Sequence, residues 1–469
     1  MAKEKNKPDT LHYRDKLSTV SNEGKRIWVF AKKPKGSFTN KRKILAFLLL
    51  AIFYVGPFLK FDGEPIMLFN ILERKFVIFG VVFWPQDFHL ILLTFISSIV
   101  FIALFTVVFG RLFCGWVCPQ TIFMEFIFRQ IEWMIEGSPA AQRKLDQGPM
   151  NIEKLWKKTL KHTIFWAISI ITSATFLAYI IGINEVFDFL KEGPIDNFGG
   201  YAGLIIFSGA FYFVFAFFRE QVCTIACPYG RLQGVLVDKK TILVGYDYRR
   251  GEPRGPIKKD STMDSGDCID CGSCITVCPT GIDIRNGTQL ECINCTACID
   301  ACDSVMDRVN KPKGLIRYDS EEGLEKGKHS IFNARSIAYS FVLFLLLIFV
   351  GYLFMQRGDF ESTILRARGS LYQNYGTDSL SNIYNFNLVN KSKEELFIDY
   401  KLESPKGRIK HIQENIAVPV GEVGKGTFLI VIDKKDLFSS NTPVIIGLYR
   451  NGQQVDTYSS TFVGPGSLD

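Results

Sequence analysis

Histidine is scarce in this sequence of 469 residues, and its scarcity excludes one class of membrane redox protein. The chain has only His12, His89, His162, His329 and His411. None of them lies deep within a long apolar run, so a haem held by two histidines cannot be built inside a membrane. A membrane cytochrome of that kind is therefore excluded.

Two other features are missing. All 12 cysteines lie between Cys114 and Cys302, so they do not form the disulfide framework of a secreted domain. No glycine-rich dinucleotide fingerprint follows a predicted strand. We therefore expect electrons to reach this chain from another protein or from quinol.

Long apolar runs are present, although the average composition of 47% hydrophobic residues with a formal charge of +8 conceals them. A helix that rises about 1.5 Å per residue crosses a hydrocarbon core of about 30 Å within such runs. The five predicted spans are residues 44–61, 90–109, 163–183, 201–218 and 337–354. The first run lacks a small-residue cleavage site, which predicts an uncleaved anchor. A sixth stretch, residues 67–83, is interrupted by charges and predicts an interfacial or re-entrant segment.

Lysine and arginine predict the orientation, because short basic loops stay in the cytoplasm. The 43 residues before the first run contain 13 of them, whereas residues 184–200 contain only Lys191. We therefore expect a cytoplasmic N-terminus. Five spans then place residues 219–335 in the cytoplasm and the C-terminal hundred residues outside.

Eight cysteines repeat one spacing, C-x2-C-x2-C-x3-C, which is typical of bacterial ferredoxins with two four-iron clusters. Three thiolates on one tight loop reach one cluster, and the fourth cysteine of each motif ligates the other cluster. The first cysteine set is therefore Cys268, Cys271, Cys274 and Cys302. The second cysteine set is Cys278, Cys292, Cys295 and Cys298. Zinc binding or plain buried thiols are the alternatives, and the doubled spacing argues against both.

The remaining cysteines form two Cys-x3-Cys-Pro motifs, each just after a predicted span. This membrane thiol quartet consists of Cys114, Cys118, Cys223 and Cys227. The spacing places the members of a pair on one face of a helix, and the duplication suggests that all four thiols meet. Four thiols suit a soft ion such as Cu(I), or a dithiol/disulfide couple. The alternative is that they are small buried apolar residues.

The last hundred residues alternate apolar and polar side chains as strands do, between turns rich in Gly, Pro and Asn. The strand-like runs are residues 384–388, 396–402, 428–432 and 444–449. This pattern predicts an all-β sandwich without a catalytic cluster, which we interpret as a docking module.

The fold class expected is thus a multi-domain membrane protein. A basic cytoplasmic segment (1–43) precedes a transmembrane domain with four spans (44–236). A cytoplasmic linker and ferredoxin-like α+β insert follow (237–335), then a fifth span (336–358) and an exported all-β sandwich (359–469).

Several motifs together resemble the cytochrome c oxidase accessory proteins of the CcoG/FixG/RdxA type. The matching segments include Cys114-Gly-Trp-Val-Cys118-Pro-Gln-Thr121, Arg219-Glu-Gln-Val-Cys223, Cys227-Pro-Tyr229, Gly251-Glu-Pro-Arg-Gly-Pro256, Cys278-Pro-Thr-Gly-Ile-Asp-Ile284 and Gly314-Leu-Ile-Arg-Tyr318. The resemblance covers nearly the whole chain. It implies two 4Fe-4S clusters on the eight loop cysteines, a candidate copper site at the membrane thiol quartet, and an immunoglobulin-like C-terminal domain.

The resemblance also implies an activity, the reduction of Cu(II) to Cu(I) for assembly of a haem-copper oxidase. Its expected partners are the lipid bilayer, copper ions, a cytoplasmic electron donor and copper chaperones or oxidase assembly factors, without nucleic acid. Two other functions remain open. One is a quinol-linked electron conduit to another redox enzyme, and the other is a non-catalytic scaffold for copper delivery.

Overall fold

The computed structural model describes residues 18–465 except 22, 24, 62–63, 72–74, 257–265, 328–332, 368, 370, 393 and 413–416. The chain divides into two compact units at the junction between Gly351 and Tyr352. Each unit is described by itself below. The larger unit carries all 12 cysteines and the smaller one carries none.

Four helices in the described residues are long and apolar enough to cross a membrane. They are α2 (Phe88–Phe109), α7 (Ile152–Ile181), α9 (Phe198–Phe213) with its π-helical continuation Val214–Phe218, and α15 (Ala334–Met355). Most of their apolar side chains face outward. An apolar surface of this extent is stable in contact with lipid and unfavourable in contact with water, so the chain is a membrane protein. These helices correspond to the second to fifth predicted spans.

The first predicted span has different bounds from those expected. Helix α1 runs Ser37–Val55, and Lys60–Phe61 form the short strand β1 instead of continuing the helix. The helix therefore begins before its basic residues, and Arg42 lies inside it. Its later turns expose large apolar side chains, among them Ile44 and Phe47.

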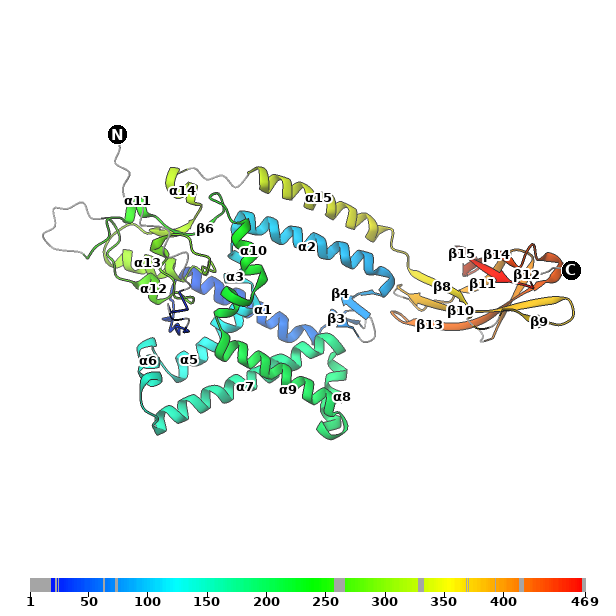
Figure 1. The fold of residues 1–469 in the computed structure, drawn as a ribbon, viewed down its shortest axis with the longest axis horizontal. Helices are drawn as coiled ribbons and strands as arrows, with labels where there is room; N and C mark the ends of the chain where they lie inside the picture. The colour runs from blue at the N-terminus through cyan, green and yellow to red at the C-terminus, as the bar shows by residue number, and fades with distance from the viewer. Residues whose placement is uncertain are drawn as a thin grey trace. The chain divides into compact units, whose positions relative to one another are not determined.

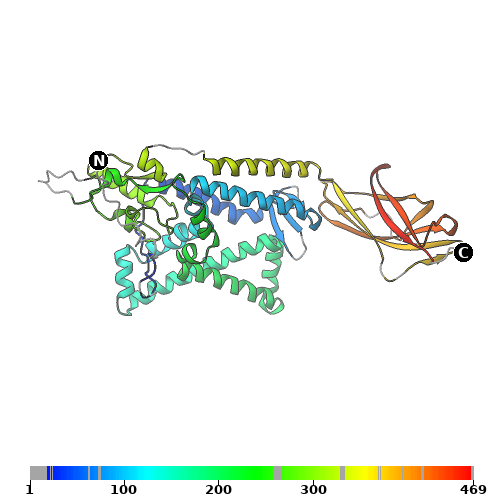
Figure 2. The same cartoon turned by 45° about the horizontal axis from the view of Figure 1, so that its top comes forward.

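Three strands between residues 67 and 83 form an antiparallel sheet. Its strands are β3 (Met67–Asn70), β4 (Lys75–Ile78) and β5 (Val81–Phe83). Strand β3 packs against α7. In both views α7 and α9 lie side by side and are joined by α8 (Ile183–Asp196) (Figures 1 and 2).

The ferredoxin-like region is built on two strands and several short helices. Strand β6 (Leu243–Tyr246) pairs antiparallel with β7 (Ile316–Asp319), so part of the predicted linker after residue 237 belongs to the folded region. Helices α12 (Ser273–Thr276) and α13 (Ala297–Arg308) follow the second cysteine of each motif. Figure 1 shows α11 (Tyr248–Gly251), α12, α13 and β6 gathered at one end of this unit.

The two cysteine loops repeat the same backbone conformation. Asp270 and Gly272 flank Cys271 with φ values of 53° and 62°. Asn294 and Thr296 flank Cys295 in the same way, with φ values of 53° and 64°. Left-handed residues on both sides of a cysteine turn the chain tightly around it. The repeated spacing in the sequence is therefore a repeated loop geometry.

The C-terminal unit contains two antiparallel sheets. The first has the order β12-β13-β10-β8, formed by Gly407–His411, Val423–Asp433, Ser379–Asn390 and Phe360–Arg366, and β9 (Gln373–Tyr375) also pairs with β10. The second has the order β11-β14-β15, formed by Asp399–Ser404, Asn441–Arg450 and Gln453–Val463. Apolar side chains from both sheets share one core, which includes Tyr384, Phe428, Val444, Ile446 and Phe462. The alternation seen in the sequence is the alternation between this core and the surface.

Candidate metal centres

The first cysteine set surrounds a small cavity of about 20 Å³. Cys268, Cys271 and Cys274 come from the first loop, and Cys302 comes from α13. Apolar side chains such as Met306 and Leu315 complete the walls. Cys271 is the exposed member of the set, whereas Cys268 and Cys274 are buried.

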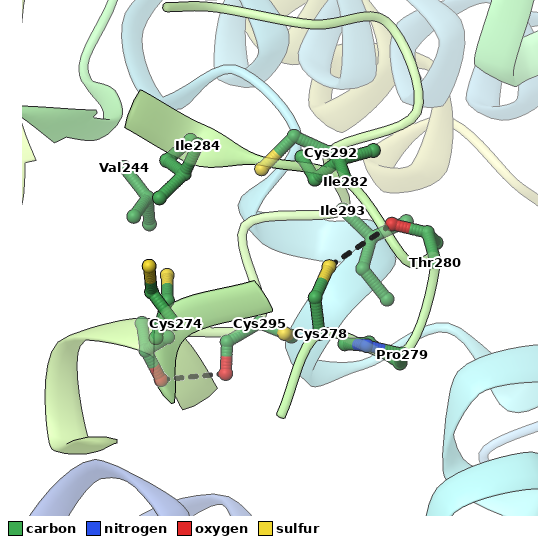
Figure 3. Close-up of a pocket in the computed structure, with 12 residues that line it drawn as sticks. Val244, Cys274, Cys278, Pro279, Thr280, Ile282, Ile284, Cys292, Ile293 and Cys295 are labelled. Atoms are coloured by element: carbon green, nitrogen blue, oxygen red, sulfur yellow. Dashed lines mark hydrogen bonds between the residues drawn. The ribbon is translucent and has the colours of Figure 1, made fainter. Parts of the chain in front are cut away.

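The second cysteine set lines a cavity of the same size, shown in Figure 3. Cys278, Cys292, Cys295 and Cys298 meet there, and Val244, Ile282, Ile284 and Ile293 are among its apolar lining. Figure 3 shows Cys278 and Cys292 on opposite sides of this cavity. The Sγ atom of Cys278 is hydrogen-bonded to Thr280. Cys274 also lines this cavity, so the two sets are adjacent.

Each cavity thus combines three cysteines of one motif with the fourth cysteine of the other, as crossed ligation requires. The donor set suits a four-iron cluster because it offers four thiols and largely apolar walls. Burial raises the pKa of Cys274, Cys292 and Cys302 to about 12. A metal that replaces these protons removes the cost of an isolated buried thiolate.

Unsatisfied hydrogen-bond donors around the second cysteine set are a further sign that this site fits an iron-sulfur cluster. The Nδ2 atom of Asn294 is buried without a hydrogen-bond partner, and the residue is 1% exposed between Cys292 and Cys295. The Nη2 atom of Arg42 is unsatisfied in the same way. Buried donors without partners are rare in folded proteins. Cluster sulfur atoms accept hydrogen bonds, so a bound cluster would satisfy such groups.

The membrane thiol quartet lies at two helix breaks rather than on two continuous helix faces. Cys114 lies in α3 (Leu112–Trp116), and Cys118 adopts an extended conformation before Pro119 begins α4 (Pro119–Phe123). The expectation of one shared helical face is therefore wrong, because a residue before proline avoids the helical region.

The second thiol pair has the same break. Cys223 lies in the π-helix Val222–Ala226, and Cys227 is extended where α10 (Pro228–Leu236) begins. The structure places the two pairs near each other. Cys223 is close enough to the other three thiols to interact electrostatically with each of them. Burial raises the pKa of Cys114 to about 11 and that of Cys223 to about 12.

The four thiols are close without converging on one point. In the part of the chain that the structure describes, no group of three or more His, Cys, Asp or Glu side chains is placed to hold a single metal ion. Ligation of one ion by the whole quartet therefore requires the thiols to move closer together.

Gln233 is a polar neighbour of the quartet that the motif did not predict. Its Oε1 atom accepts a hydrogen bond of 3.3 Å from the Cys114 thiol. Its Nε2 atom has no partner although the residue is 0% exposed. Gln233 lies six residues after Cys227 on α10, and no spacing in the sequence connects it to Cys114.

The quartet lies next to the buried group that holds part of the second cysteine set. Cys114 packs against the buried group formed by Val277, Ile293, Cys295 and Ala297. Gly115 makes this approach possible, because a Cβ atom there would lie 2.4 Å from the carbonyl oxygen of Ile293. The two thiol-rich sites are thus in contact through adjacent residues.

Side chains of the first membrane motif tie the two sites together. The indole Nε1 of Trp116 donates to the hydroxyl of Tyr318 at 3.0 Å, and that hydroxyl donates to the carbonyl oxygen of Asn294 at 3.1 Å. The buried guanidinium of Arg111 donates to the carbonyl oxygens of Leu290 and Gly230. These bonds fix the position of the cysteine loop on the membrane helices.

A buried ion-pair network supports the second membrane motif. Arg219 is 2% exposed and donates to the carboxylate of Glu132 on α5 (Arg129–Ile135). Lys161 lies 3.6 Å from the same carboxylate. Buried charges of this kind persist only when they are paired. The network fixes the chain four residues before Cys223.

Comparison with known proteins agrees with this architecture. Residues 218–321 match the family model described as a 4Fe-4S dicluster domain, and residues 91–136 match a 4Fe-4S binding domain. Residues 350–465 match the IG-like fold at the C-terminus of FixG. The match to the 4Fe-4S binding domain spans the first membrane motif, which contains Cys114 and Cys118.

Similar proteins cover most of the chain. Protein RdxA of Cereibacter sphaeroides is 33% identical over 86% of this chain and 88% of its own. Protein RdxB of the same organism is 32% identical over 89% and 94%. The nitrogen fixation protein FixG of Rhizobium meliloti is 35% identical over 63% of this chain and 57% of its own.

The apolar helices, the paired cysteine loops and these matches define a class: a membrane-associated 4Fe-4S electron-transfer protein with a C-terminal immunoglobulin-like domain. Within that class, the chain belongs to the FixG/CcoG/RdxA family.

Proposed function

We propose that this protein is a cupric reductase, in which iron-sulfur clusters held by the loop cysteines would supply the electrons that reduce Cu(II) at the membrane thiol quartet. The observation that carries the proposal is the packing of Cys114 against the buried group that contains Cys295. Two redox sites in contact exchange electrons without a separate carrier. A bound four-iron cluster supplies electrons one at a time, and Cu(II) takes up one electron to become Cu(I).

The loop cysteines hold two 4Fe-4S clusters in this proposal. The first cysteine set ligates one cluster and the second cysteine set ligates the other, in agreement with the residues around each cavity. The thiols of the quartet act on copper as substrate, because sulfur ligands favour Cu(I) over Cu(II). Gln233 orients the Cys114 thiol through its hydrogen bond.

The proposed topology has five spans. Helix α1 supplies the first, since its apolar part follows the basic residues at positions 41–43. The N-terminus and the clusters lie in the cytoplasm of a bacterial inner membrane, and the immunoglobulin-like sandwich lies on the periplasmic side. The exported sandwich then serves as a docking module for an oxidase assembly factor or a copper chaperone. The Cu(I) released enters assembly of a haem-copper oxidase.

The proposal is tested by the rate of Cu(I) formation by the chemically reduced protein, followed with a Cu(I)-specific chelator. We expect the variant with all four quartet cysteines changed to serine to keep its cluster spectrum but to bind less Cu(I) and reduce Cu(II) slowly. Cys271→Ser serves as the matched control for cluster loss and should abolish reduction. An unchanged rate and copper stoichiometry in the quadruple variant would overturn the assignment and favour the quinol-linked conduit.

One observation favours a second candidate for the quartet. The 4Fe-4S binding model matches residues 91–136, which contain Cys114 and Cys118 but none of the loop cysteines. The second candidate is therefore that the four thiols hold a further iron-sulfur group, which relays electrons. Iron analysis separates the candidates, because two four-iron clusters give about eight iron atoms per chain. A higher content that falls to about eight in the quadruple serine variant would support the relay.

A further inference from the structure

Arg42 is a buried cation whose position the function described so far does not use. It lies in α1 and is 3% exposed. Its Nε atom donates a hydrogen bond of 3.0 Å to the carbonyl oxygen of Gly115, between the two cysteines of the first membrane motif. Its Nη2 atom is buried and has no partner. A buried guanidinium with an unused donor is costly unless a further acceptor lies beside it.

The second cysteine set is the neighbour that this charge acts on. Arg42 interacts electrostatically with Cys295, and Arg111 does so with Cys292. Both arginines are buried, so water screens their charges weakly. Arg129 lies nearby and donates to the carbonyl oxygen of Pro279, next to Cys278. Three arginines thus surround the second set.

Three carboxylates lie near the second set: Glu125, Glu291 next to Cys292, and Asp300 two residues after Cys298. The carboxylate of Asp300 accepts hydrogen bonds from the first turn of α1. Glu125 also interacts with Cys295, but its carboxylate is paired with Arg129 at 2.5 Å. Arg42 and Arg111 have carbonyl oxygens as their partners, so their positive charges are not neutralised by those bonds.

The first cysteine set has a different environment. Its nearby cation, Arg285, pairs with the carboxylates of Asp283 and Asp270. The carboxylate of Asp303 places a negative charge near Cys302. Cys271 is exposed, so this set faces the solvent. The arginine here is neutralised, and the site is open to a donor.

We propose that Arg42 raises the reduction potential of the cluster held by the second cysteine set above that of the cluster held by the first. Reduction adds a negative charge, which the neighbouring guanidinium stabilises, and hydrogen bonds to cluster sulfur act in the same direction. One electron from an external reductant enters at the first set, near exposed Cys271. It would then pass to the cluster held by the second set, which would be reduced as the cluster held by the first set is reoxidised.

The order of the two reduction potentials gives electron transfer in the proposed function a direction. Cys114 packs against the buried group that contains Cys295 of the second set, so the electron arrives beside the membrane thiol quartet. Only this last step rests on the proposed function. The difference in potential is a property of the two cysteine sets and does not involve copper.

The test is a potentiometric titration of the intact protein without copper, followed by electron spin resonance. In Arg42→Gln we expect the potential of one cluster to fall while that of the other stays unchanged. The shifted signal should be the one that Cys278→Ser perturbs. Arg42→Lys keeps the charge but loses the guanidinium fork whose Nε and Nη2 atoms reach two places at once. It should therefore shift the same cluster by less, and it keeps the proposal testable if the glutamine variant assembles poorly.

Lys41→Gln is the matched control, because it removes the same charge from the neighbouring exposed position on α1. It should leave both potentials unchanged. Equal shifts of both clusters in Arg42→Gln, no shift in either Arg42 variant, or the same shift in Lys41→Gln would overturn the proposal. The titration is repeated in the quadruple serine variant, where a retained difference supports the proposal even if copper reduction fails.

Discussion

The carboxylate of Asp300 accepts two hydrogen bonds from Thr39, one from its backbone N–H at 2.7 Å and one from its hydroxyl at 2.6 Å. The backbone N–H of Phe38 donates to the other carboxylate oxygen at 3.1 Å. The first N–H groups of a helix have no partner within the helix and carry partial positive charge. Asp300 lies in α13, between Cys298 and Cys302, so an aspartate of the second cysteine motif caps the first apolar helix.

Removal of this cap should loosen α1 from the cysteine loops. We expect Asp300→Ala to lower the free energy of unfolding by about 1–3 kcal/mol, because several buried donors lose their acceptor. Asp300→Asn keeps an acceptor and should cost less. Thermal unfolding followed by cluster absorbance measures the effect. Asp307→Ala is the control on the exposed face of the same helix, and an equal loss of stability there would contradict the role of the cap.

Gly115→Ala should separate the membrane thiol quartet from the second cysteine set. The new methyl group would meet the backbone of Ile293 and Asn294, which cannot move as easily as a flexible side chain. We expect copper reduction to slow by about an order of magnitude, equivalent to about 1.4 kcal/mol in the barrier, with both clusters retained. The chelator assay measures the rate. Gly203→Ala, where a Cβ meets no atom within 4 Å, is the control and should keep the normal rate.

The crossed ligation predicts which cluster each substitution damages. Cys278→Ser should alter the cluster that also depends on Cys292, and Cys302→Ser the cluster that also depends on Cys268. Spin-resonance spectra of single and paired variants distinguish the two signals. If each substitution altered only the cluster of its own motif, the ligands would not cross.

The ion pair between Glu132 and Arg219 should make stability depend on acid pH. Burial alone would raise the pKa of Glu132, but Arg219 and Lys161 outweigh burial and lower that pKa below its ordinary value. A carboxylate with a lowered pKa stabilises the folded state above its unfolded pKa of about 4.3. The stabilisation is lost as pH falls through the folded pKa.

Unfolding in detergent, measured from about pH 6 down to pH 3, tests this dependence. Glu132→Gln should unfold more easily near neutral pH and show a weaker dependence on pH below about 4.5. Glu132→Ala should cost about 3–5 kcal/mol near neutral pH, because it leaves Arg219 buried without its main partner. A curve for Glu132→Gln parallel to that of the unaltered protein would contradict the assignment.

The topology makes a separate prediction. A phosphatase fused after Asp469 should be active, and a fluorescent protein fused there should be dark, because the C-terminal unit is proposed to lie in the periplasm. A fusion within the cysteine loops should show the reverse. A bright fluorescent fusion after Asp469 with an inactive phosphatase fusion would reverse the proposed orientation.

Much of the architecture follows from periodicity and spacing, because both report local structure. Four of the five predicted spans lie in the apolar helices, and the strand-like runs at 384–388 and 428–432 lie within β10 and β13. The cysteine spacing also predicted which thiols would surround each cavity. These features depend on residues that are close in the sequence or on a strongly constrained loop.

The rest depends on contacts between distant segments. A run of apolar residues did not show that the chain after Val55 turns into strand β1. The i, i+4 spacing concealed the break before Pro119, which changes the relation between Cys114 and Cys118. Gln233 and Arg42 have ordinary local sequence contexts, so only the folded chain shows that they meet the thiol sites.

The cap on α1 bears on how this chain can be cut into fragments. Gly36 approaches Asp300 so closely that a side chain at position 36 would collide with it. The surface of the ferredoxin-like region is therefore completed by a segment about 260 residues before Asp300 in the sequence. A fragment that starts near residue 237 would lack that segment, and a chimaera would keep the contact only by exchanging residues 36–42 together with the cysteine loops.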